Sequence, residues 1–270
     1  MNISQALTIA GSDSGGGAGI QADLKTFQEL GVYGMSVITA VTAQNTAGVQ
    51  GVYPVELAGI GQQLHSIGND LNPVAVKTGM LFSADIIREV AAAVRTYKWH
   101  TLVIDPVMVA KGGSVLLQQQ AVQALIAELL PLAAVVTPNV PEAELLIGSR
   151  IRTLAEREQA AVQLVDMGAR AVVVKGGHDL TTAQAIDVLY DGQHVHYVEG
   201  RRIDTPHTHG TGCTYSAAIT AELAKGSDVL TAVQTAKAFV HAAIEDGLGI
   251  GSVHGPTNHF AYRLRGAIRS

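Results

Sequence analysis

The segment from Thr208 to Cys213 places Gly210 and Gly212 immediately before a run of small residues that predicts a helix. Two glycines let the backbone turn so that successive N–H groups point outward, and the helix dipole adds positive potential at the same place. Such an anion hole suits a γ-phosphoryl group in transit, because electrostatic stabilisation dominates catalysis of phosphoryl transfer. A plain glycine turn before a buried helix is the alternative, and the local pattern does not separate the two.

The segment ends in Cys213, a thiol at the predicted N-terminus of that helix. A helix N-terminus lowers the pKa of a thiol, so we expect Cys213 to accept a proton from a substrate hydroxyl. The alternative is a small buried apolar residue, because free cysteines are among the most buried residue types. Cys213 is the only cysteine of the chain, which excludes an intramolecular disulfide and favours a cytoplasmic protein.

A second glycine-rich segment, residues 11–19, follows the first predicted strand. It lacks the Gly-Lys-Ser or Gly-Lys-Thr ending of a P-loop, and its glycines do not have the spacing of a dinucleotide-binding loop. The sequence therefore supports neither a P-loop NTPase nor a Rossmann dehydrogenase. A ligand that approaches the backbone closely is one interpretation. A tight strand-to-helix turn is the other, and it accounts for only some of the glycines.

Polar side chains also stand where predicted strands end. The amide of Gln44 could pair with the ring-nitrogen and amino edge of an aminopyrimidine, by the bidentate geometry with which glutamine reads adenine. Lys175, beside two glycines, could contact a phosphate. The alternative for both is an exposed side chain. For Asp23, one turn into the helix after the first glycine loop, the alternative to a binding role is a solvated helix face.

Three oxygen-bearing side chains follow two consecutive strands, namely Asp105, Asn139 and Glu142. They could hold Mg²⁺ directly or through water, since hard cations take oxygen ligands and Mg²⁺ keeps several waters. Asn139 and Glu142 could instead cap and charge the start of a helix. The histidines do not have the spacing of a zinc site, and Cys213 has no thiolate partner.

These groups need a scaffold that brings strand ends together. Short apolar runs alternate with helical patterns along the whole chain, without a linker, a repeat or a low-complexity tract. This alternation predicts one α/β domain over residues 1–270, with three α/β/α layers and a central, mostly parallel sheet. In such sheets ligands bind beyond the carboxyl ends of the strands, so we expect the polar clusters at the strand ends to converge.

The expected elements follow from apolar periodicity and from caps. Thr153 and Glu156 form a capping box, and Asp191-Gly192 predicts a hairpin. Strands are expected at about 6–10, 35–42, 75–78, 102–104, 134–137, 171–174, 185–190 and 194–198. Helices are expected at about 20–30, 56–70, 83–97, 119–130, 153–167, 213–225 and 228–246.

Composition limits the class of protein. Hydrophobic residues make up 47% of the 270 residues and aromatic residues only 4%, so a large core must be built from Val, Ile, Leu and Ala. The formal net charge of −5 argues against a nucleic-acid or anionic-membrane partner. No apolar run approaches the ~18 residues that a membrane span requires.

Taken together, these segments resemble the ribokinase-like superfamily, and in particular the hydroxymethylpyrimidine/phosphomethylpyrimidine kinases of thiamine biosynthesis. The resemblance covers nearly the whole chain in the order of the family, which makes it far more specific than any single motif. The matching stretches are Ala6–Asp13, Gly16–Phe27, Val41–Thr46, Lys77–Leu81, Asp105–Met108, Thr137–Asn139 with Pro141–Ala143, Lys175–His178 and Thr208–Cys213.

The resemblance implies a transferase that uses ATP and Mg²⁺ and is usually a homodimer. It implies phosphorylation of 4-amino-5-hydroxymethyl-2-methylpyrimidine, and then of its monophosphate to the diphosphate. It makes Cys213 the base and assigns the anion hole to Gly210 and Gly212, with Lys175 beside the transferred group. The other roles it implies are substrate binding by Gln44, Asp23, Gly11, Met80 and Val107, ATP binding by Asn139, Lys175, Thr211 and Lys237, and metal binding by Asp105 and Glu142.

The pyridoxal kinases of Gram-positive bacteria are the close alternative. They carry a second cysteine after their Asp-Pro-Val-Met segment, and typically methionine at the position that reads the pyrimidine. The corresponding residues here are Ala110 and Gln44, and both favour the pyrimidine kinase. The tail from Gly255 to His259 also looks like that of the pyridoxal kinases, so vitamin B6 remains the alternative substrate. Gly112-Gly113 would permit the segment from Ala110 to close as a lid.

Overall fold

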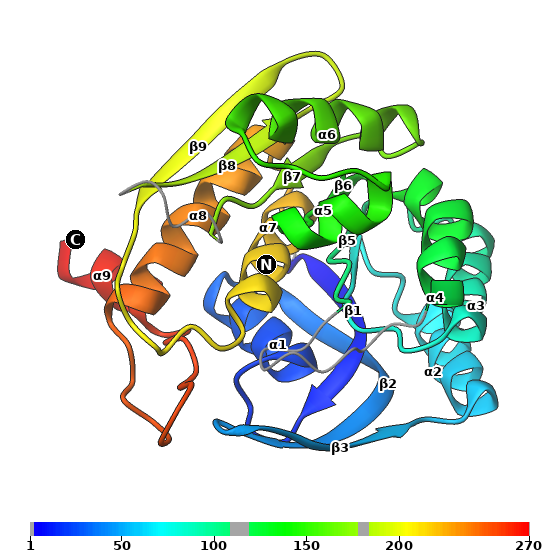
Figure 1. Ribbon diagram of the computed structural model, residues 1–270. Helices are drawn as coiled ribbons and strands as arrows, with labels where there is room; N and C mark the ends of the chain where they lie inside the picture. Colours follow the sequence, from blue (N-terminus) through cyan, green and yellow to red (C-terminus); the bar gives the residue numbers. More distant parts are fainter. Residues whose placement is uncertain (1–2, 109–118, 178–183, 270) are drawn as a thin grey trace.

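The computed structural model describes residues 3–108, 119–177 and 184–269. Within these residues nine strands form one sheet in the order β3-β2-β1-β4-β5-β6-β7-β8-β9 (Figure 1). The strands are β1 (Gln5–Asp13), β2 (Tyr33–Asn45), β3 (Gly48–Pro54), β4 (Ala75–Thr78), β5 (Leu102–Ile104), β6 (Val135–Val136), β7 (Val172–Val174), β8 (Gln184–Tyr190) and β9 (Val195–Arg201).

The strands from β2 through β7 in this order run parallel, and β3, β8 and β9 add antiparallel edges. Both faces of the sheet are covered by helices, as parallel sheets require. The helices are α1 (Gly19–Glu29), α2 (Leu57–Asp70), α3 (Ala84–Thr96), α4 (Gln119–Ala124), α5 (Val140–Ile147), α6 (Leu154–Asp166), α7 (Thr211–Ala224), α8 (Val229–Glu245) and α9 (Ala261–Arg269).

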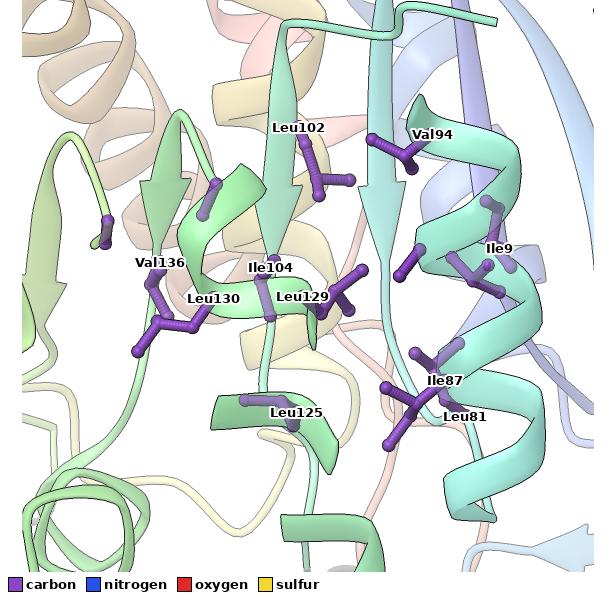
Figure 2. Close-up of a cluster of buried hydrophobic side chains, with 14 of the residues drawn as sticks. Ile9, Leu81, Ile87, Val94, Leu102, Ile104, Leu125, Leu129, Leu130 and Val136 are labelled. Atoms are coloured by element: carbon purple, nitrogen blue, oxygen red, sulfur yellow. The ribbon is translucent and has the colours of Figure 1, made fainter. Parts of the chain in front are cut away.

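Two apolar layers hold the sheet in place. Helices α2 to α6 bury their apolar faces against one side, where Ile87 and Val94 of α3 face Leu102 and Ile104 of β5 (Figure 2). Helices α1, α7 and α8 cover the other side, where Phe239 of α8 is fully buried. The predicted three-layer α/β/α architecture is confirmed.

Most predicted boundaries agree with the structure within a few residues, including the capping box of Thr153 and Glu156. Helix α5 is expected only as the helix that Asn139 and Glu142 could cap, and two other elements escape the sequence patterns. The edge strand β3 is mostly half-exposed and carries two glycines, so it lacks a strong alternation of apolar residues. Helix α9 is short and rich in arginine. The helix expected to run unbroken through 119–130 instead changes into a π-helical turn at Leu125–Leu129, just before Pro131.

No helix among the described residues is long and apolar enough to cross a bilayer. The predicted lid around Ala110 to Gly113 lies outside the described residues, as does His178 of the Lys175 motif.

Candidate active site

A cleft of about 690 Å³ opens where the parallel strands end at their carboxyl side. It gathers segments that are more than 200 residues apart in the chain, from Gly11 to Cys213. The predicted site residues that line it are Gly11, Gln44, Met80, Asp105, Val107, Asn139, Glu142, Lys175, Gly210, Thr211, Gly212, Cys213 and Lys237. Asp23 does not belong to this wall, and its position is described below.

The loop before α7 has the geometry that an anion hole requires. Gly210 adopts a left-handed conformation (φ +83°) and begins the helix without a side-chain cap, and Gly212 and Cys213 of the first turn line the cleft. The Thr211 N–H group of this turn donates to Thr208 O at 3.3 Å. A Cβ atom at Gly210 would overlap the carbonyl oxygen of Gly17 in the first glycine loop. The two glycine loops therefore touch through their backbones, and only glycine permits the contact.

The Cys213 thiol lies half-buried in the wall of the cleft, within the first turn of α7. Burial raises its pKa to about 11, although the Lys77 ammonium and the Gly19 N–H group, which donates to the sulfur, act in the opposite direction. The predicted lowering of this pKa is therefore wrong for the ligand-free protein. The helix N-terminus is present, but desolvation and the nearby carboxylates outweigh it.

Asp23 does not line the cleft itself but forms an ion pair with Lys77, which does. Its fully buried carboxylate accepts hydrogen bonds from Lys77 Nζ at 2.8 Å and from Thr8 Oγ1 at 2.6 Å. The solvated helix face considered for Asp23 is wrong, and so is its place in the pocket wall. Lys77 lines the cleft instead. Burial lowers the pKa of its ammonium group, but the Asp23 carboxylate and the other nearby negative groups outweigh burial, so the pKa is raised overall.

Sequence patterns gave Lys77 no role, although one signal was available. A lysine within the short apolar strand β4 (Ala75-Val76-Lys77-Thr78) must be buried on both faces of the sheet. Buried lysines require a partner charge. The pattern could have found the residue, but its partner Asp23 is 54 positions away in the chain.

A second ion pair joins Lys175 to Asp105. Lys175 Nζ lies 2.9 Å from Asp105 Oδ1 and 3.9 Å from Glu142 Oε2, so one ammonium group serves two carboxylates. Burial raises the pKa of Glu142 to about 7 despite Lys175. Burial also raises the pKa of Asp105, but the Lys175 and Lys77 ammonium groups outweigh burial, so the pKa of Asp105 is lowered overall.

Asn139 and Glu142 also form the N-terminal capping box of α5. Asn139 Oδ1 accepts from Glu142 N at 2.9 Å, and Glu142 Oε2 accepts from Asn139 N at 2.7 Å. The capping alternative is confirmed, and both side chains nevertheless line the cleft. Capping leaves acceptor positions on the Glu142 carboxylate free for a ligand.

Gln44 reaches the cleft from the end of β2. Its backbone is held by Ser14, whose Oγ donates to Gln44 O at 2.7 Å and accepts from Gln44 N at 2.8 Å. Its side-chain amide lies 3.3 Å from His209 Nε2, and His209 Nε2 lies 2.8 Å from Asp13 Oδ2. Local sequence patterns indicate no role for Asp13 or His209, because their contact depends on the meeting of the two glycine loops.

The remaining predicted residues occupy other parts of the wall. Gly11 is buried, and a Cβ atom there would press on Met80 Cε at 2.5 Å, so these two residues shape one surface together with Val107. Lys237 of α8 donates to Asp187 Oδ2 and to Ala185 O, both at 2.8 Å.

The fold has three layers, and the strand ends of its sheet gather ammonium groups, carboxylates and a glycine loop at a helix N-terminus. This arrangement defines a small-molecule kinase of the ribokinase-like class. A profile of the phosphomethylpyrimidine kinase family matches residues 13–258. The chain therefore belongs to the phosphomethylpyrimidine kinase family and is a phosphotransferase.

Individual relatives agree with this assignment. The chain is 54% identical to a hydroxymethylpyrimidine/phosphomethylpyrimidine kinase of Bacillus subtilis over 97% of both chains. It is 55% identical to one of Haemophilus influenzae, over 97% of this chain and 98% of the other. Among solved structures, an ADP complex of Bacillus subtilis pyridoxal kinase superposes with a TM-score of 0.91 at 46% identity, covering 97% of this chain and 100% of that chain.

Proposed function

We propose that the protein transfers the γ-phosphoryl group of ATP to the hydroxymethyl group of 4-amino-5-hydroxymethyl-2-methylpyrimidine, and then phosphorylates the resulting monophosphate to the diphosphate. The observation that carries this proposal is that Gln44 lines the same cleft as the Gly210–Cys213 loop. The amide of Gln44 has the donor and acceptor that an aminopyrimidine edge requires. The loop supplies N–H groups for the transferred phosphoryl group.

In the transfer, the substrate hydroxyl oxygen forms a bond to the γ-phosphorus while the bond from phosphorus to the ADP oxygen breaks. The transition state is loose, so the hydroxyl proton leaves late and a strong base is not required. The hydroxyl proton passes to the thiolate form of Cys213, which the Lys77 and Lys175 ammonium groups favour and which burial disfavours in the ligand-free protein. The backbone N–H groups that follow Gly210 donate hydrogen bonds to the phosphoryl oxygens and stabilise their negative charge.

The donor set of the cleft fits Mg²⁺ that keeps most of its water and phosphate ligands. Glu142 and Asp105 are the carboxylates at the site, and Lys175 already neutralises part of their charge. Among the described residues, no three His, Cys, Asp or Glu side chains gather into a protein-only metal site. We therefore propose that Glu142 and Asp105 would hold Mg²⁺, which would offset the charge of the phosphate groups.

The other assignments rest on position in the cleft and on the family resemblance. Asn139, Lys175, Thr211 and Lys237 are proposed to bind ATP, and Gly11, Met80 and Val107 to pack on the pyrimidine. A homodimer remains a proposal of the family resemblance, and a cytoplasmic location remains a proposal that rests on the single cysteine.

Vitamin B6 phosphorylation is the second candidate, because a pyridoxal kinase superposes on this chain along almost its whole length. The two are separated by Gln44→Met, which keeps the length of the side chain but removes the amide. We expect the variant to lose about 1–3 kcal/mol of pyrimidine recognition, measured as kcat/KM, and to keep any activity on pyridoxal. A wild-type protein that phosphorylates pyridoxal rapidly and the pyrimidine not at all would contradict the proposal.

A further inference from the structure

The tail segment, Gly255–His259, lies between α8 and α9 in the chain and contacts the loop Thr208–Cys213, the transfer loop of the proposed reaction. All five residues of the tail segment are described by the structure, and none of them lines the cleft. Gly255, Thr257 and His259 are nevertheless buried. Any contribution of the tail segment to phosphoryl transfer must therefore pass through residues that do line the cleft.

The first contact of the tail segment is with the backbone of His209. His209 N donates to Gly255 O at 3.1 Å, and Thr257 N donates to His209 O at 3.2 Å, so the two segments pair for one residue as parallel strands do. Pro256 lies between these two hydrogen bonds, and a Cβ atom at Gly17 would come within 2.9 Å of its Cβ atom. The tail segment therefore packs against both glycine loops.

The second contact reaches the first turn of α7. His259 Nε2 lies 3.0 Å from Thr214 Oγ1, and neither residue is more than 4% exposed. Thr214 directly follows Cys213, and its N–H group donates to Gly210 O at 2.9 Å, which closes the first turn of the helix. A partner for the Thr214 hydroxyl therefore fixes the turn that carries the thiol.

Two other buried threonines in helices bond within their own helix. Thr26 Oγ1 donates to Ala22 O at 2.7 Å, and Thr220 Oγ1, also in α7, donates to Ser216 O at 2.8 Å. A bond to the carbonyl four residues earlier is common for a threonine in a helix. Thr214 instead contacts a side chain 45 positions further along the chain. The contact between Thr214 and the tail segment is therefore a tertiary link.

His259 makes this link as a neutral ring. Burial lowers the pKa of His259 to about 4, and the Lys25 ammonium group acts in the same direction. A neutral imidazole has one donor and one acceptor nitrogen, and a hydroxyl can pair with either of them. The link therefore does not require a proton taken up from solvent at neutral pH.

Asn258 anchors the tail segment itself. Its N–H group donates to Ala243 O at 2.8 Å, and its side-chain Nδ2 donates to Asp246 O at 2.9 Å. Both carbonyl groups lie at the C-terminal end of α8, which covers the same side of the sheet as α7. The tail segment is thus tied to a neighbouring helix and can serve as a fixed support.

We propose that the tail segment supports the transfer loop, and that His259 and Thr214 are positioning residues that hold the first turn of α7, with its Cys213 thiol, at the place that phosphoryl transfer requires. The inference rests on the proposed function, in which this turn serves the transferred group. A displacement of about 1 Å at a catalytic group can cost roughly 100-fold in rate. Loss of the link should therefore act on kcat more than on KM.

The matched variants are Thr214→Val and Thr220→Val. Each removes one buried hydroxyl from α7 and keeps the shape of the side chain, but only Thr214→Val breaks the link to His259. Thr214→Val should lower kcat about tenfold or more and leave KM for the pyrimidine within about twofold, and Thr220→Val should change neither. Equal kcat values in the two variants, or a raised KM with an unchanged kcat in Thr214→Val, overturn the inference.

A second pair of variants tests the link from the other side. His259→Gln keeps a polar atom near the position of Nε2, and His259→Leu removes it. The glutamine variant should retain most of kcat, and the leucine variant should lose as much as Thr214→Val. Adding Thr214→Val to His259→Leu should cause little further loss, because both changes break the same contact. An equal loss of kcat in the glutamine and leucine variants overturns the inference.

A readout without substrate separates this inference from the proposed function. Alkylation of Cys213 by iodoacetamide at pH 8 should be about threefold faster or more in Thr214→Val and in His259→Leu, because a loosened first turn exposes the thiol. The rate should stay at the wild-type value in Thr220→Val and in His259→Gln. An unchanged rate in Thr214→Val overturns the inference. Absence of pyrimidine turnover in the wild type overturns the proposed function, and the alkylation rates then decide the inference alone.

Discussion

Cys213 lies among charges of both signs. The ammonium groups of Lys77 and Lys175 favour its thiolate, and the carboxylates of Asp23 and Asp105 oppose it. Burial is the largest influence and leaves the pKa at about 11. The thiol is therefore protonated at neutral pH in the ligand-free protein, and a base role requires that it first lose this proton, which the ammonium groups nearby favour.

The first prediction at this scale concerns the pH dependence of Cys213. Only the thiolate reacts with iodoacetamide, and a pKa near 11 means that the thiolate fraction rises about tenfold for each pH unit between 7 and 9. The alkylation rate of the ligand-free protein, followed by mass spectrometry, should rise accordingly. Because Cys213 is the only cysteine, denatured protein serves as the control. A rate that is flat above pH 7 would restore the lowered pKa.

The second prediction concerns the buried pair of Lys77 and Asp23. Lys77→Met should reduce the free energy of unfolding by about 3–5 kcal/mol, because it leaves a buried carboxylate without its cation. The carboxyl of Asp23 already has a raised pKa because of burial, and loss of Lys77 raises it further. The native state then binds a proton that the unfolded state releases, so the deficit should grow from pH 5 to pH 8.

The control for this pair is the double variant Lys77→Met with Asp23→Leu. It replaces the ion pair by apolar side chains and should recover much of the lost stability and the pH dependence. Urea unfolding at the two pH values measures both effects. A double variant as unstable as Lys77→Met, with the same pH dependence, would show that the buried carboxylate is not the cause.

At the scale of elements, helix α7 carries a glycine of positive φ at each end. Gly210 precedes its first turn with φ +83°, and Gly226 follows its last turn with φ +91°. A Cβ atom at Gly226 would meet no other atom within 4 Å, whereas one at Gly210 would overlap Gly17 O. A residue with a Cβ atom would be strained at both positions, and at Gly210 it would also overlap the first glycine loop.

The third prediction follows from this difference. Gly226→Ala should cost about 1 kcal/mol of stability through backbone strain and leave kcat unchanged. Gly210→Ala should cost more and reduce kcat at least tenfold, because the loops that build the proposed anion hole must separate. Thermal unfolding and steady-state kinetics of the two variants provide the test. Equal kcat values would mean that the loop contact does not support transfer.

At the scale of the whole molecule, the parallel sheet turns distant sequence segments into one site. The carboxyl ends of β1, β2, β4, β5, β6 and β7 open into the same cleft, so each strand contributes one or two polar groups. The antiparallel strand β3 closes one edge of the sheet and leaves Val41 of β2 and its own Tyr53 exposed.

The fourth prediction belongs to the scale of the whole molecule and concerns the expected homodimer. Light scattering should give about twice the mass of one chain, and Tyr53→Lys should shift the protein toward one chain if the β3 edge is the contact. Leu264→Lys, on the exposed surface of α9, is the control. A single-chain mass for the wild type contradicts the dimer, and a dimer that tolerates Tyr53→Lys places the contact elsewhere.

Sequence patterns predicted the layered architecture and the strand-end positions of Gln44, Asp105, Asn139 and Lys175. They succeed because apolar periodicity and capping residues are local signals, and because strand ends in a parallel sheet must converge. They missed β3 and α9, whose residues are too exposed to give a strong apolar pattern.

By itself, the sequence determined the fold, the family and many of the residues that face the cleft. Only the tertiary structure decided their chemical state. It replaced a lowered Cys213 pKa by a raised one, moved Asp23 out of the wall and into a pair with Lys77, and joined Asp13 to His209. Burial and partner charge depend on contacts between segments far apart in the chain, and local spacing carries no information about them.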